Sequence, residues 1–473
     1  MKGPSLPILD ETLYSEALPL DGARKDLQPA DVHGRFHTAR TAVFAALIAV
    51  WIALPWIPIG GHPAVFIDVD RRSFYLFGAT FNAQDGWMLF FLVTGVGFGL
   101  VYATTLLGRV WCGWACPQTV FLEGVFRRVE RWLEGPRERR LHRNAGPWTP
   151  EKLLRKGAKQ VVFALLAFLI AHVLLAYFVS LPKTFEMVRH NPAAHPEAFL
   201  WATALTVVLY VNFAWFREQF CVVLCPYGRL QSVLTDPQSL FVGYDAPRGE
   251  PRGKKGAQGA GDCVDCHRCL VVCPTGIDIR KGAQLECIGC TACIDACDAV
   301  MDRLDRPRGL IRYDSLEGLA GRPRRILRPR VVAYTILLVL GATVAAGAAR
   351  GRTNFEVNLL RLQGAPFTLT GDEVRDSLDL HIMNKVAAPR TFHIDVAPVD
   401  AMQVVLPVPM ATIPPLGSVH IPLFLTMPRA KVHGTFPVRV SVRTEDGAPA
   451  IEVSGTFLGP GASTAAVVPS ARP

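Results

Sequence analysis

Cysteine is absent from most of this chain. The sequence has twelve cysteines, and all of them lie in four short clusters. A disulfide framework would scatter cysteines through the exported part of a protein, so their absence there excludes a disulfide-stabilised fold. It indicates metal or redox chemistry in a reducing compartment. The clusters are Cys112 with Cys116, Cys221 with Cys225, Cys263 to Cys273, and Cys287 to Cys297.

Charged residues are absent from five apolar stretches. Half of all residues are hydrophobic and the mean hydropathy is +0.25, which is high for a soluble protein of this length. A helix rises about 1.5 Å per residue, so each stretch can cross, or nearly cross, about 30 Å of hydrocarbon. One stretch alone could be a buried core helix, but five, flanked by Trp and Arg, predict five transmembrane helices. They are Ala42 to Ile59, Gly86 to Leu107, Val161 to Leu181, Ala198 to Phe216 and Val331 to Ala349.

Histidine is nearly absent from these stretches, since His172 is the only one in any of them. A haem b held between two helices needs two histidine ligands, so a transmembrane haem chain is excluded. A single histidine inside a membrane most often forms a hydrogen bond to a neighbouring helix, and it is by default also a candidate functional residue.

Basic residues are distributed unevenly between the loops. Residues 127–159 contain eleven Lys or Arg and residues 303–330 contain nine, whereas residues 60–85 and 182–197 contain two each. The positive-inside rule therefore predicts a cytosolic N-terminus and, after five crossings, an exported C-terminal domain. This topology and contact with lipid headgroups account for most of the net charge of +10, so no nucleic-acid partner is expected.

The third and fourth cysteine clusters repeat one spacing. Both have the C-x2-C-x2-C-x3-C pattern of bacterial ferredoxins, in which the fourth cysteine of each run ligates the other cluster. We therefore predict two [4Fe-4S] clusters. The first would be held by Cys263, Cys266, Cys269 and Cys297, and the second by Cys287, Cys290, Cys293 and Cys273.

Two other kinds of site use similar spacings. Pairs of C-x2-C also bind zinc, but zinc sites rarely repeat the x2-x2-x3 spacing twice. Cys263 to His267 also matches the C-x-x-C-H motif for attaching haem c. Both of its thiols already belong to the ferredoxin pattern, and the predicted topology places them in the cytosol, whereas haem c is attached outside. His267 is therefore expected to be a solvated loop residue.

The first two clusters form an internal repeat. Each half of the membrane domain is an apolar hairpin that ends in C-x3-C-P. If the helix continues through the motif, the two thiols of each pair lie on one face at i and i+4. The pairs could converge into a four-thiol site, form a transient dithiol/disulfide couple, bind a soft metal ion, or only pack. We favour a redox or metal role, because the thiols recur in register with proline in both halves.

The rest of the chain carries no chemical motif. Residues 1–38 are polar and have no cleavable signal pattern, so a mostly flexible cytosolic lead is expected. After Arg350, apolar and polar residues alternate between Pro and Gly turns, which predicts a β-sandwich of about a hundred residues. The sandwich has no cysteine and no catalytic spacing, so we expect it to bind or dock partners outside the membrane.

Together these features predict a multi-domain membrane protein. It has a bundle of five transmembrane α-helices, an inserted cytosolic ferredoxin-like segment with two [4Fe-4S] clusters, and a C-terminal β-sandwich. The predicted parts are a flexible lead (1–38), four transmembrane helices (39–235), the cytosolic [4Fe-4S] segment (236–330), the fifth helix (331–349), the sandwich (350–459) and a disordered tail (460–473).

This assembly closely resembles the FixG/CcoG family of cytochrome oxidase accessory proteins. The resemblance covers nearly the whole chain, apart from the lead and the last fourteen residues. It implies an immunoglobulin-like sandwich in the periplasm and a location in the bacterial inner membrane. The most specific pieces are Trp111 to Gln118, Cys225 to Tyr227, Tyr244 to Arg252 and Cys287 to Cys290.

The resemblance also implies an oxidoreductase, a cupric reductase that converts Cu(II) to Cu(I) during assembly of a haem-copper oxidase. A cytosolic electron donor would reduce the ferredoxin segment, and copper would be the substrate. Thiolates favour Cu(I), and a [4Fe-4S] cluster carries the single electron that this step needs. Oxidase subunits or copper chaperones are the implied partners. The expected catalytic residues on the copper side are Cys112, Cys116, Cys221 and Cys225.

Two other functions fit part of the pattern. The chain is also similar to the membrane ferredoxins that serve periplasmic reductases, which carry twin C-x3-C-P motifs and would make it a quinol-linked electron relay. The large exported sandwich argues against this, since a bare relay would not require one. The second alternative is a non-redox assembly scaffold whose clusters are structural and whose sandwich docks oxidase subunits.

Overall fold

The computed structural model describes residues 27–460, except 70–72, 83–84, 255–257, 352, 363–364, 387, 433, 446 and 448. The predicted tail beyond residue 460 and most of the predicted lead therefore lie outside the described residues. The chain divides into two compact units. The first comprises Met1–Val69 and Trp87–Ala345, and the second comprises Asp70–Gly86 and Ala346–Pro473.

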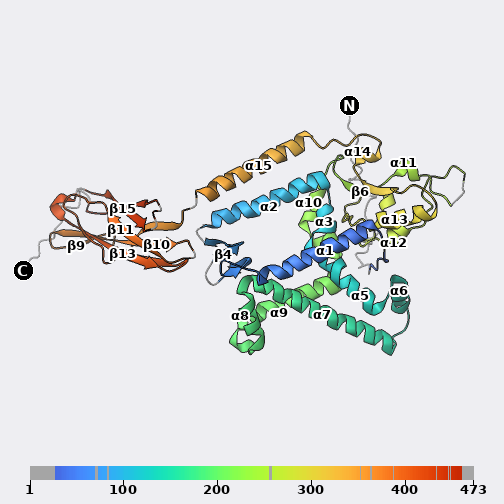
Figure 1. The fold of residues 1–473 in the computed structure, drawn as a ribbon, viewed down its shortest axis with the longest axis horizontal. Helices are drawn as coiled ribbons and strands as arrows, with labels where there is room; N and C mark the ends of the chain where they lie inside the picture. The colour runs from blue at the N-terminus through green and yellow to red at the C-terminus, as the bar shows by residue number, and fades with distance from the viewer. Residues whose placement is uncertain are drawn as a thin grey trace, which may run out of the picture. The chain divides into compact units, whose positions relative to one another are not determined.

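Five helices of the described chain are long and apolar enough to cross a membrane, which confirms the predicted number (Figure 1). The third begins before the predicted Val161, because Thr149 caps its N-terminus by accepting the Lys152 N–H at 3.2 Å and Pro150 takes the first helical position. The helices are α1 (Arg35–Ala53), α2 (Gly86–Leu107), α7 (Pro150–Val179), α9 (Pro196–Val211) and α15 (Pro329–Arg350).

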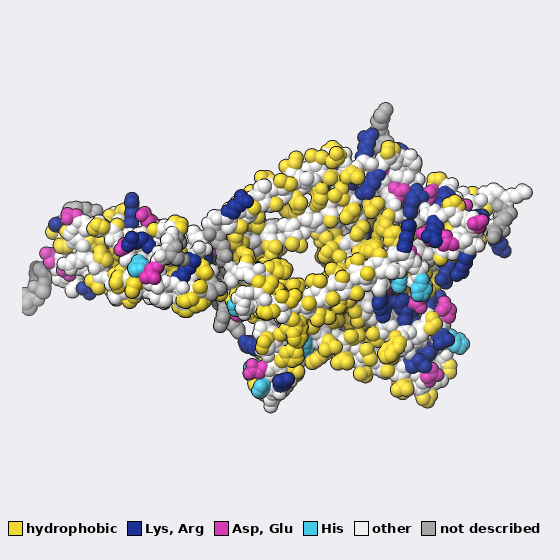
Figure 2. Space-filling model, in the orientation of Figure 1, with side chains coloured by type: hydrophobic (Ala, Val, Ile, Leu, Met, Phe, Trp, Pro, Cys, Tyr) yellow, Lys and Arg dark blue, Asp and Glu magenta, His cyan; other side chains and the backbone are white. Residues whose placement is uncertain are grey.

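The surfaces of these helices are apolar. Figure 2 shows hydrophobic side chains covering the long helices, whereas Lys and Arg gather mainly at the end next to the ferredoxin segment. Large side chains such as Phe90 and Val96 are exposed by 64% and 66%. Water would make such a surface costly and hydrocarbon would not, so the chain is a multi-pass membrane protein.

Short helices join the long ones at the end that carries the cysteines. Three of them are π-helical, a form that is rare and often marks functional sites. Their shared core includes Phe126, whose ring stacks on Phe213 at 4.6 Å and meets Phe163 edge-on at 5.0 Å. These short helices are α3 (Val110–Trp114), α4 (Pro117–Phe121), η5 (Leu122–Phe126), α5 (Arg127–Glu134), α6 (Arg137–Ala145), η7 (Asn212–Phe216), η8 (Phe220–Leu224) and α10 (Pro226–Leu234). The helix α8 (Leu181–Arg189) lies at the other end, where it joins α7 to α9 (Figure 1).

The ferredoxin segment is built on a two-stranded antiparallel sheet. Strand β6 (Phe241–Tyr244) pairs with β7 (Ile311–Asp314), and the helix α13 (Ala292–Arg303) packs against them. The carboxylate of Asp295 on α13 accepts the first free N–H groups of α1, which anchors the segment to the membrane helix. Its shorter helices are α11 (Ala246–Gly249), α12 (Arg268–Val271), η9 (Ile279–Lys281) and α14 (Leu316–Leu319).

The second unit contains the predicted β-sandwich. One sheet has the strand order β12-β14-β10-β8, with β9 on β10, and the other has β13-β11-β15-β16. Alternate residues of the longer strands fill the core between them, as the sequence pattern predicts. The strands are β8 (Phe355–Arg361), β9 (Thr368–Thr370), β10 (Glu373–Asn384), β11 (Arg390–Val396), β12 (Gln403–Val405), β13 (Met410–Ile413), β14 (Ser418–Pro428), β15 (Phe436–Thr444) and β16 (Ile451–Phe457).

The remaining strands are short. Strand β4 (Ser73–Leu76) forms a hairpin with β5 (Ala79–Asn82), and β1 (Pro58–Ile59) pairs with β2 (His62–Pro63). Strand β3 (Val65–Asp68) follows β2. None of these strands carries a cysteine, so the chemistry is confined to the membrane helices' ends and the ferredoxin segment.

The core of the sandwich gives a direct test of its packing. Leu380 on β10 is fully buried, and we expect Leu380→Ala to destabilise the sandwich by about 2–5 kcal/mol, because truncation leaves a cavity. Hydrogen exchange of the β10 amides in the full-length protein in detergent would measure the loss. The matched control is Leu369→Ala on β9, where the side chain is 48% exposed and the cost should stay within about 0.5 kcal/mol.

Candidate functional site

The first predicted ligand set lines one cavity of the ferredoxin segment. Its other walls include Tyr244, Met301 and Ile311, which form one hydrophobic core with Cys263 and Cys269. The thiols that line it are Cys263, Cys266, Cys269 and Cys297.

The second predicted ligand set lines a neighbouring cavity. Cys269 also contributes to its wall, so the two cavities adjoin. Gly289 and Thr291 have positive φ angles of 66° and 64°, which turn the loop around the thiols. The members of this set are Cys273, Cys287, Cys290 and Cys293.

The donor chemistry of both cavities fits an iron–sulfur cluster. Burial raises the pKa of Cys290 and of Cys297 to about 12, so an uncompensated thiolate is disfavoured at either position. Soft, buried thiolates need a bound cation, and groups of four in this spacing are the ligands of [4Fe-4S] clusters. A bound cluster would supply storage for single electrons at each cavity.

His267 lies where the sequence predicts, in the loop of the first cavity. Its side chain is 51% exposed, and its Nδ1 lies 2.7 Å from the carbonyl oxygen of Asp265. Among the described residues, by contrast, His172 has no hydrogen bond to a neighbouring helix. Its Nδ1 lies 2.8 Å from the carbonyl oxygen of Phe168, one turn earlier in α7. The expected interhelical hydrogen bond is therefore not seen in this part of the chain.

The helix does not continue through either C-x3-C-P motif, contrary to the i, i+4 arrangement considered from the sequence. Cys112 lies in α3 and Cys221 in η8, but Cys116 and Cys225 have extended backbones and precede the next helix. The reason is the proline that follows, which disfavours the helical conformation for the preceding residue and favours the first position of a new helix. Both halves of the repeat break in the same way.

The structure nevertheless brings the four thiols of the two motifs together. Cys116, Cys112 and Cys225 each act electrostatically on Cys221, whose pKa burial raises to about 12. Burial likewise raises the pKa of Cys112 to about 11, although the amide of Gln231 donates to its Sγ at 3.3 Å. The thiols of Cys112 and Cys221 are thus mostly neutral near pH 7. Among the described residues, no three His, Cys, Asp or Glu side chains are arranged to hold a single metal ion.

The first C-x3-C motif packs directly on the loop of the second cavity. A side-chain carbon on Gly113 would lie 2.5 Å from the carbonyl oxygen of Gly289, so glycine alone fits there. Tyr313 joins the two pieces, because its hydroxyl donates to Gly289 O and accepts from the Trp114 indole N–H, each at 3.0 Å. Arg109 also donates to the carbonyl oxygen of Cys287 at 2.9 Å.

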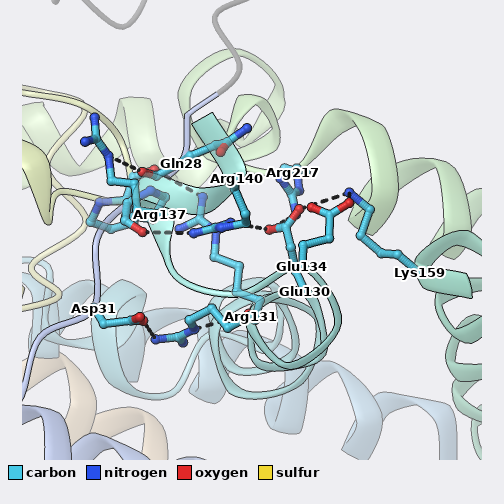
Figure 3. Close-up of polar contacts among 12 residues, drawn as sticks. Gln28, Asp31, Glu130, Arg131, Glu134, Arg137, Arg140, Lys159 and Arg217 are labelled. Atoms are coloured by element: carbon cyan, nitrogen blue, oxygen red, sulfur yellow. Dashed lines mark hydrogen bonds and ion pairs between the residues drawn. The ribbon is translucent and has the colours of Figure 1, made fainter. Parts of the chain in front are cut away.

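A buried ion-pair network lies beside the cysteines, and the sequence reading missed it. Figure 3 shows Glu130 at its centre, with Arg217 at 2.8 Å, Arg140 at 3.1 Å and Lys159 at 3.3 Å. Lys159 also contacts Glu134 at 3.1 Å. The available signal was the pair of glutamates four residues apart in a strongly basic stretch. Topology and contact with lipid headgroups account for most of the basic residues in the sequence analysis, so an ion-pair role is not predicted there.

The same basic helices hold the end of the N-terminal lead. Arg137 donates to the carbonyl oxygen of Gln28 at 2.8 Å, and Arg131 pairs with Asp31. Ala30 donates its N–H to Val271 of the ferredoxin segment at 3.0 Å. Residues 28–31 are therefore fixed against the cysteine-bearing core.

Three parts of the chain match known families. Residues 216–316 match a 4Fe-4S dicluster domain and residues 87–139 match a 4Fe-4S binding domain. Residues 346–460 match the Ig-like fold at the C-terminus of FixG. The two iron–sulfur matches contain all twelve cysteines, including both C-x3-C motifs.

Whole proteins of similar sequence are found in bacteria. The chain is 37% identical over 396 residues to protein RdxA of Cereibacter sphaeroides, covering 80% of this chain and 83% of that protein. It is 34% identical over 425 residues to the nitrogen fixation protein FixG of Rhizobium meliloti, covering 80% of each. A crystal structure of a FixG-related protein from Vibrio parahaemolyticus aligns with 23% of this chain and 97% of that one, at 17% identity and a TM-score of 0.21.

The contact between Gly113 and Gly289 can be tested by adding a methyl group. We expect Gly113→Ala to destabilise the first unit by about 1–3 kcal/mol, because the atoms that the new methyl group would meet all belong to the backbone of the loop. Alkylation of Cys112 should also become faster as α3 lifts from the loop. Gly97→Ala is the control, since that site in α2 has open space around it. Equal stability of the two variants would contradict the close contact.

The role of Glu130 is testable through pH. Burial alone would raise its pKa, but Arg217, Lys159 and Arg140 outweigh burial and lower the pKa from 4.5 to about 2. Its stabilising contribution is therefore complete above about pH 4.5 and is lost as the pH falls toward 2. We expect Glu130→Gln to cost about 3–5 kcal/mol at pH 7, since it removes the buried carboxylate that Arg217, Arg140 and Lys159 share.

Unfolding of the Glu130 variant should be followed from pH 7 downward in detergent. The stability of wild type and variant should converge at acidic pH, where wild-type Glu130 is protonated. Glu151→Gln is the matched control, because that carboxylate is 65% exposed and pairs with Arg155 on the surface, where ion pairs contribute little. A constant difference at all pH values would contradict the ion-pair role.

Proposed function

The chain belongs to the FixG family, and we propose that this iron–sulfur electron-transfer protein reduces Cu(II) to Cu(I) for the assembly of a haem-copper oxidase. The observation that carries the proposal is the packing of the C-x3-C thiols against the loop of the second cavity. The proposed binding site for a soft metal ion thus adjoins the proposed second [4Fe-4S] cluster, which would store single electrons. One electron is consumed for each Cu(II) ion that becomes Cu(I).

We assign four cysteine ligands to each [4Fe-4S] cluster. The support is that each predicted set lines its own cavity, and that the last cysteine of each run lines the other run's cavity. The first set is Cys263, Cys266, Cys269 and Cys297, and the second is Cys287, Cys290, Cys293 and Cys273.

Electrons would enter at the first cavity. Cys266 is exposed, whereas Cys290 in the second cavity is buried. A cytosolic donor could therefore approach the first set closely, while the second set faces the membrane helices' ends. In this proposal the first cluster accepts electrons from the donor, and the second cluster passes them on toward the membrane helices' ends.

Copper would be reduced at the paired motifs. Cys112 and Cys221 pack on the same hydrophobic core as Cys290 and Ile288. Thiolates are soft ligands that select Cu(I), so copper bound there would be biased toward reduction. The thiols are mostly neutral when free, and copper binding would therefore release protons. A dithiol/disulfide couple formed by the same thiols is the alternative route, which would take two electrons.

The membrane topology determines the compartment in which the sandwich would meet its partners. Basic residues gather at the ferredoxin end of the long helices, which supports a cytosolic position for that end in the bacterial inner membrane (Figure 2). With five crossings the sandwich would lie in the periplasm, where oxidase subunits or copper chaperones are its proposed partners.

The decisive experiment is anaerobic EPR of the reduced full-length protein before and after addition of Cu(II). We expect the signals of two reduced clusters to disappear as Cu(I) forms. Replacing both Cys112 and Cys221 with Ser should leave the reduced signals in place and slow Cu(I) formation at least tenfold, because the clusters remain while the copper site is lost.

Three outcomes separate the alternatives. Reduced signals that persist in wild type after Cu(II) is added contradict direct transfer to copper. Signals that disappear with a quinone but not with Cu(II) favour the quinol-linked relay. Normal oxidase assembly in cells that carry Cys266→Ser and Cys290→Ser together, at normal protein levels but without clusters, favours the scaffold.

A further inference from the structure

Arg40 is a buried cation beside the second cavity. It comes from α1, is only 7% exposed, and lines the same cavity as Cys290. Its Nε donates to the carbonyl oxygen of Gly113 at 3.0 Å, and its guanidinium lies 5.0 Å from the ring centroid of Phe44. Its Nη2 is buried without a hydrogen-bond partner. No carboxylate in the described part of the chain pairs with it.

The corresponding cation at the first cavity is neutralised. Arg280 lines that cavity, but its Nε and Nη2 contact the carboxylate of Asp278 at 2.8 and 2.6 Å, and its Nη1 pairs with Asp265. The buried arginines that share the cavity of Arg40 also have acidic partners, since Arg127 pairs with Glu218. Arg40 thus stands out as a buried charge that protein groups leave uncompensated.

Such a charge acts on whatever negative charge lies nearest. Salt screens buried charges only weakly. Reduction of a [4Fe-4S] cluster adds one negative charge, and cluster potentials depend on net charge and burial. Burial by itself disfavours the reduced form, whereas a cation beside Cys290 favours it.

We propose that Arg40 is the counter-charge of the second [4Fe-4S] cluster and raises its reduction potential above the value that burial alone would give. The inference rests on the ligand sets of the proposed function. A higher potential of the second cluster favours electron transfer in one direction. One electron passes from the first cluster, which is oxidised, to the second cluster, which is reduced, and no bond is made or broken. Arg40 therefore favours the position of the electron next to the C-x3-C thiols.

The test is an EPR-monitored redox titration of the full-length protein, purified anaerobically in detergent. The signal lost in Cys290→Ser assigns the second cluster. We expect Arg40→Gln to lower the equilibrium constant for its reduction at least tenfold, which is about 59 mV for a one-electron couple, and to leave the first cluster unchanged. Arg40→Lys keeps the charge and should shift the constant less than threefold.

Arg128→Gln is the matched control. Arg128 lines the same cavity and donates to the Thr41 hydroxyl at 2.8 Å, but it is exposed to solvent, so its removal should change the constant less than twofold. Loss of the second cluster in Arg40→Gln but not in Arg40→Lys also supports a charge role.

Two results would overturn the proposal. One is an Arg40→Gln protein that holds both clusters and titrates like wild type. The other is an Arg40→Lys protein that shifts or loses the second cluster as Arg40→Gln does, because shape and hydrogen bonding to Gly113 would then matter instead of charge. Wild-type protein without iron and acid-labile sulfide would refute the proposed function itself, which is a separate and recognisable outcome.

Discussion

The backbone contact between Gly113 and Gly289 connects the membrane part of the molecule with the ferredoxin segment. The two glycines let α3 and the loop of the second cavity approach so closely that a Cβ on Gly113 would lie 2.5 Å from the carbonyl oxygen of Gly289. Arg40, Arg109 and Tyr313 then bind the carbonyl groups around that contact. The C-x3-C thiols and Cys290 consequently share one hydrophobic core instead of occupying separate domains.

Proline sets the second constraint. In both halves of the repeat it ends one helix at a cysteine and starts another, so each pair of thiols spans a helix junction. A junction can place two side chains with more freedom than a straight helix, where their spacing is fixed. The repeated break therefore explains how two motifs on different helices place four thiols within electrostatic reach of one another.

Local spacing made much of this architecture predictable. The x2-x2-x3 spacing specifies which three cysteines share a loop and which fourth cysteine reaches the other cavity. The division of eight thiols between two cavities is therefore predictable from their order in the sequence. The five apolar stretches and the alternating strands are also local signals, and each has the structure that it predicts. The helix junctions were less accessible, because a proline one position after cysteine is compatible with a helix that ends either before or at the motif.

Long-range contacts are what the sequence did not reveal. Arg40 and Gly113 lie 73 positions apart, and Glu130 meets Arg217 across 87 positions. Nothing in the residues near either arginine distinguishes a buried functional charge from one that only orients the chain in the membrane. The positive-inside rule counts both alike, so the ion-pair network and the unpaired arginine appear only once the helices are packed.

The exposure of one cysteine in the first cavity determines where oxidative damage begins. Of the twelve cysteines, Cys266 is the only exposed one, and its neighbours in the loop leave it open to small molecules. Dioxygen and peroxide therefore reach this sulfur before any other, and oxidation of a ligand dismantles the site that it supports. Exposure to air would therefore damage the first cavity first. The buried thiols would remain intact, but the protein could no longer accept electrons from its donor.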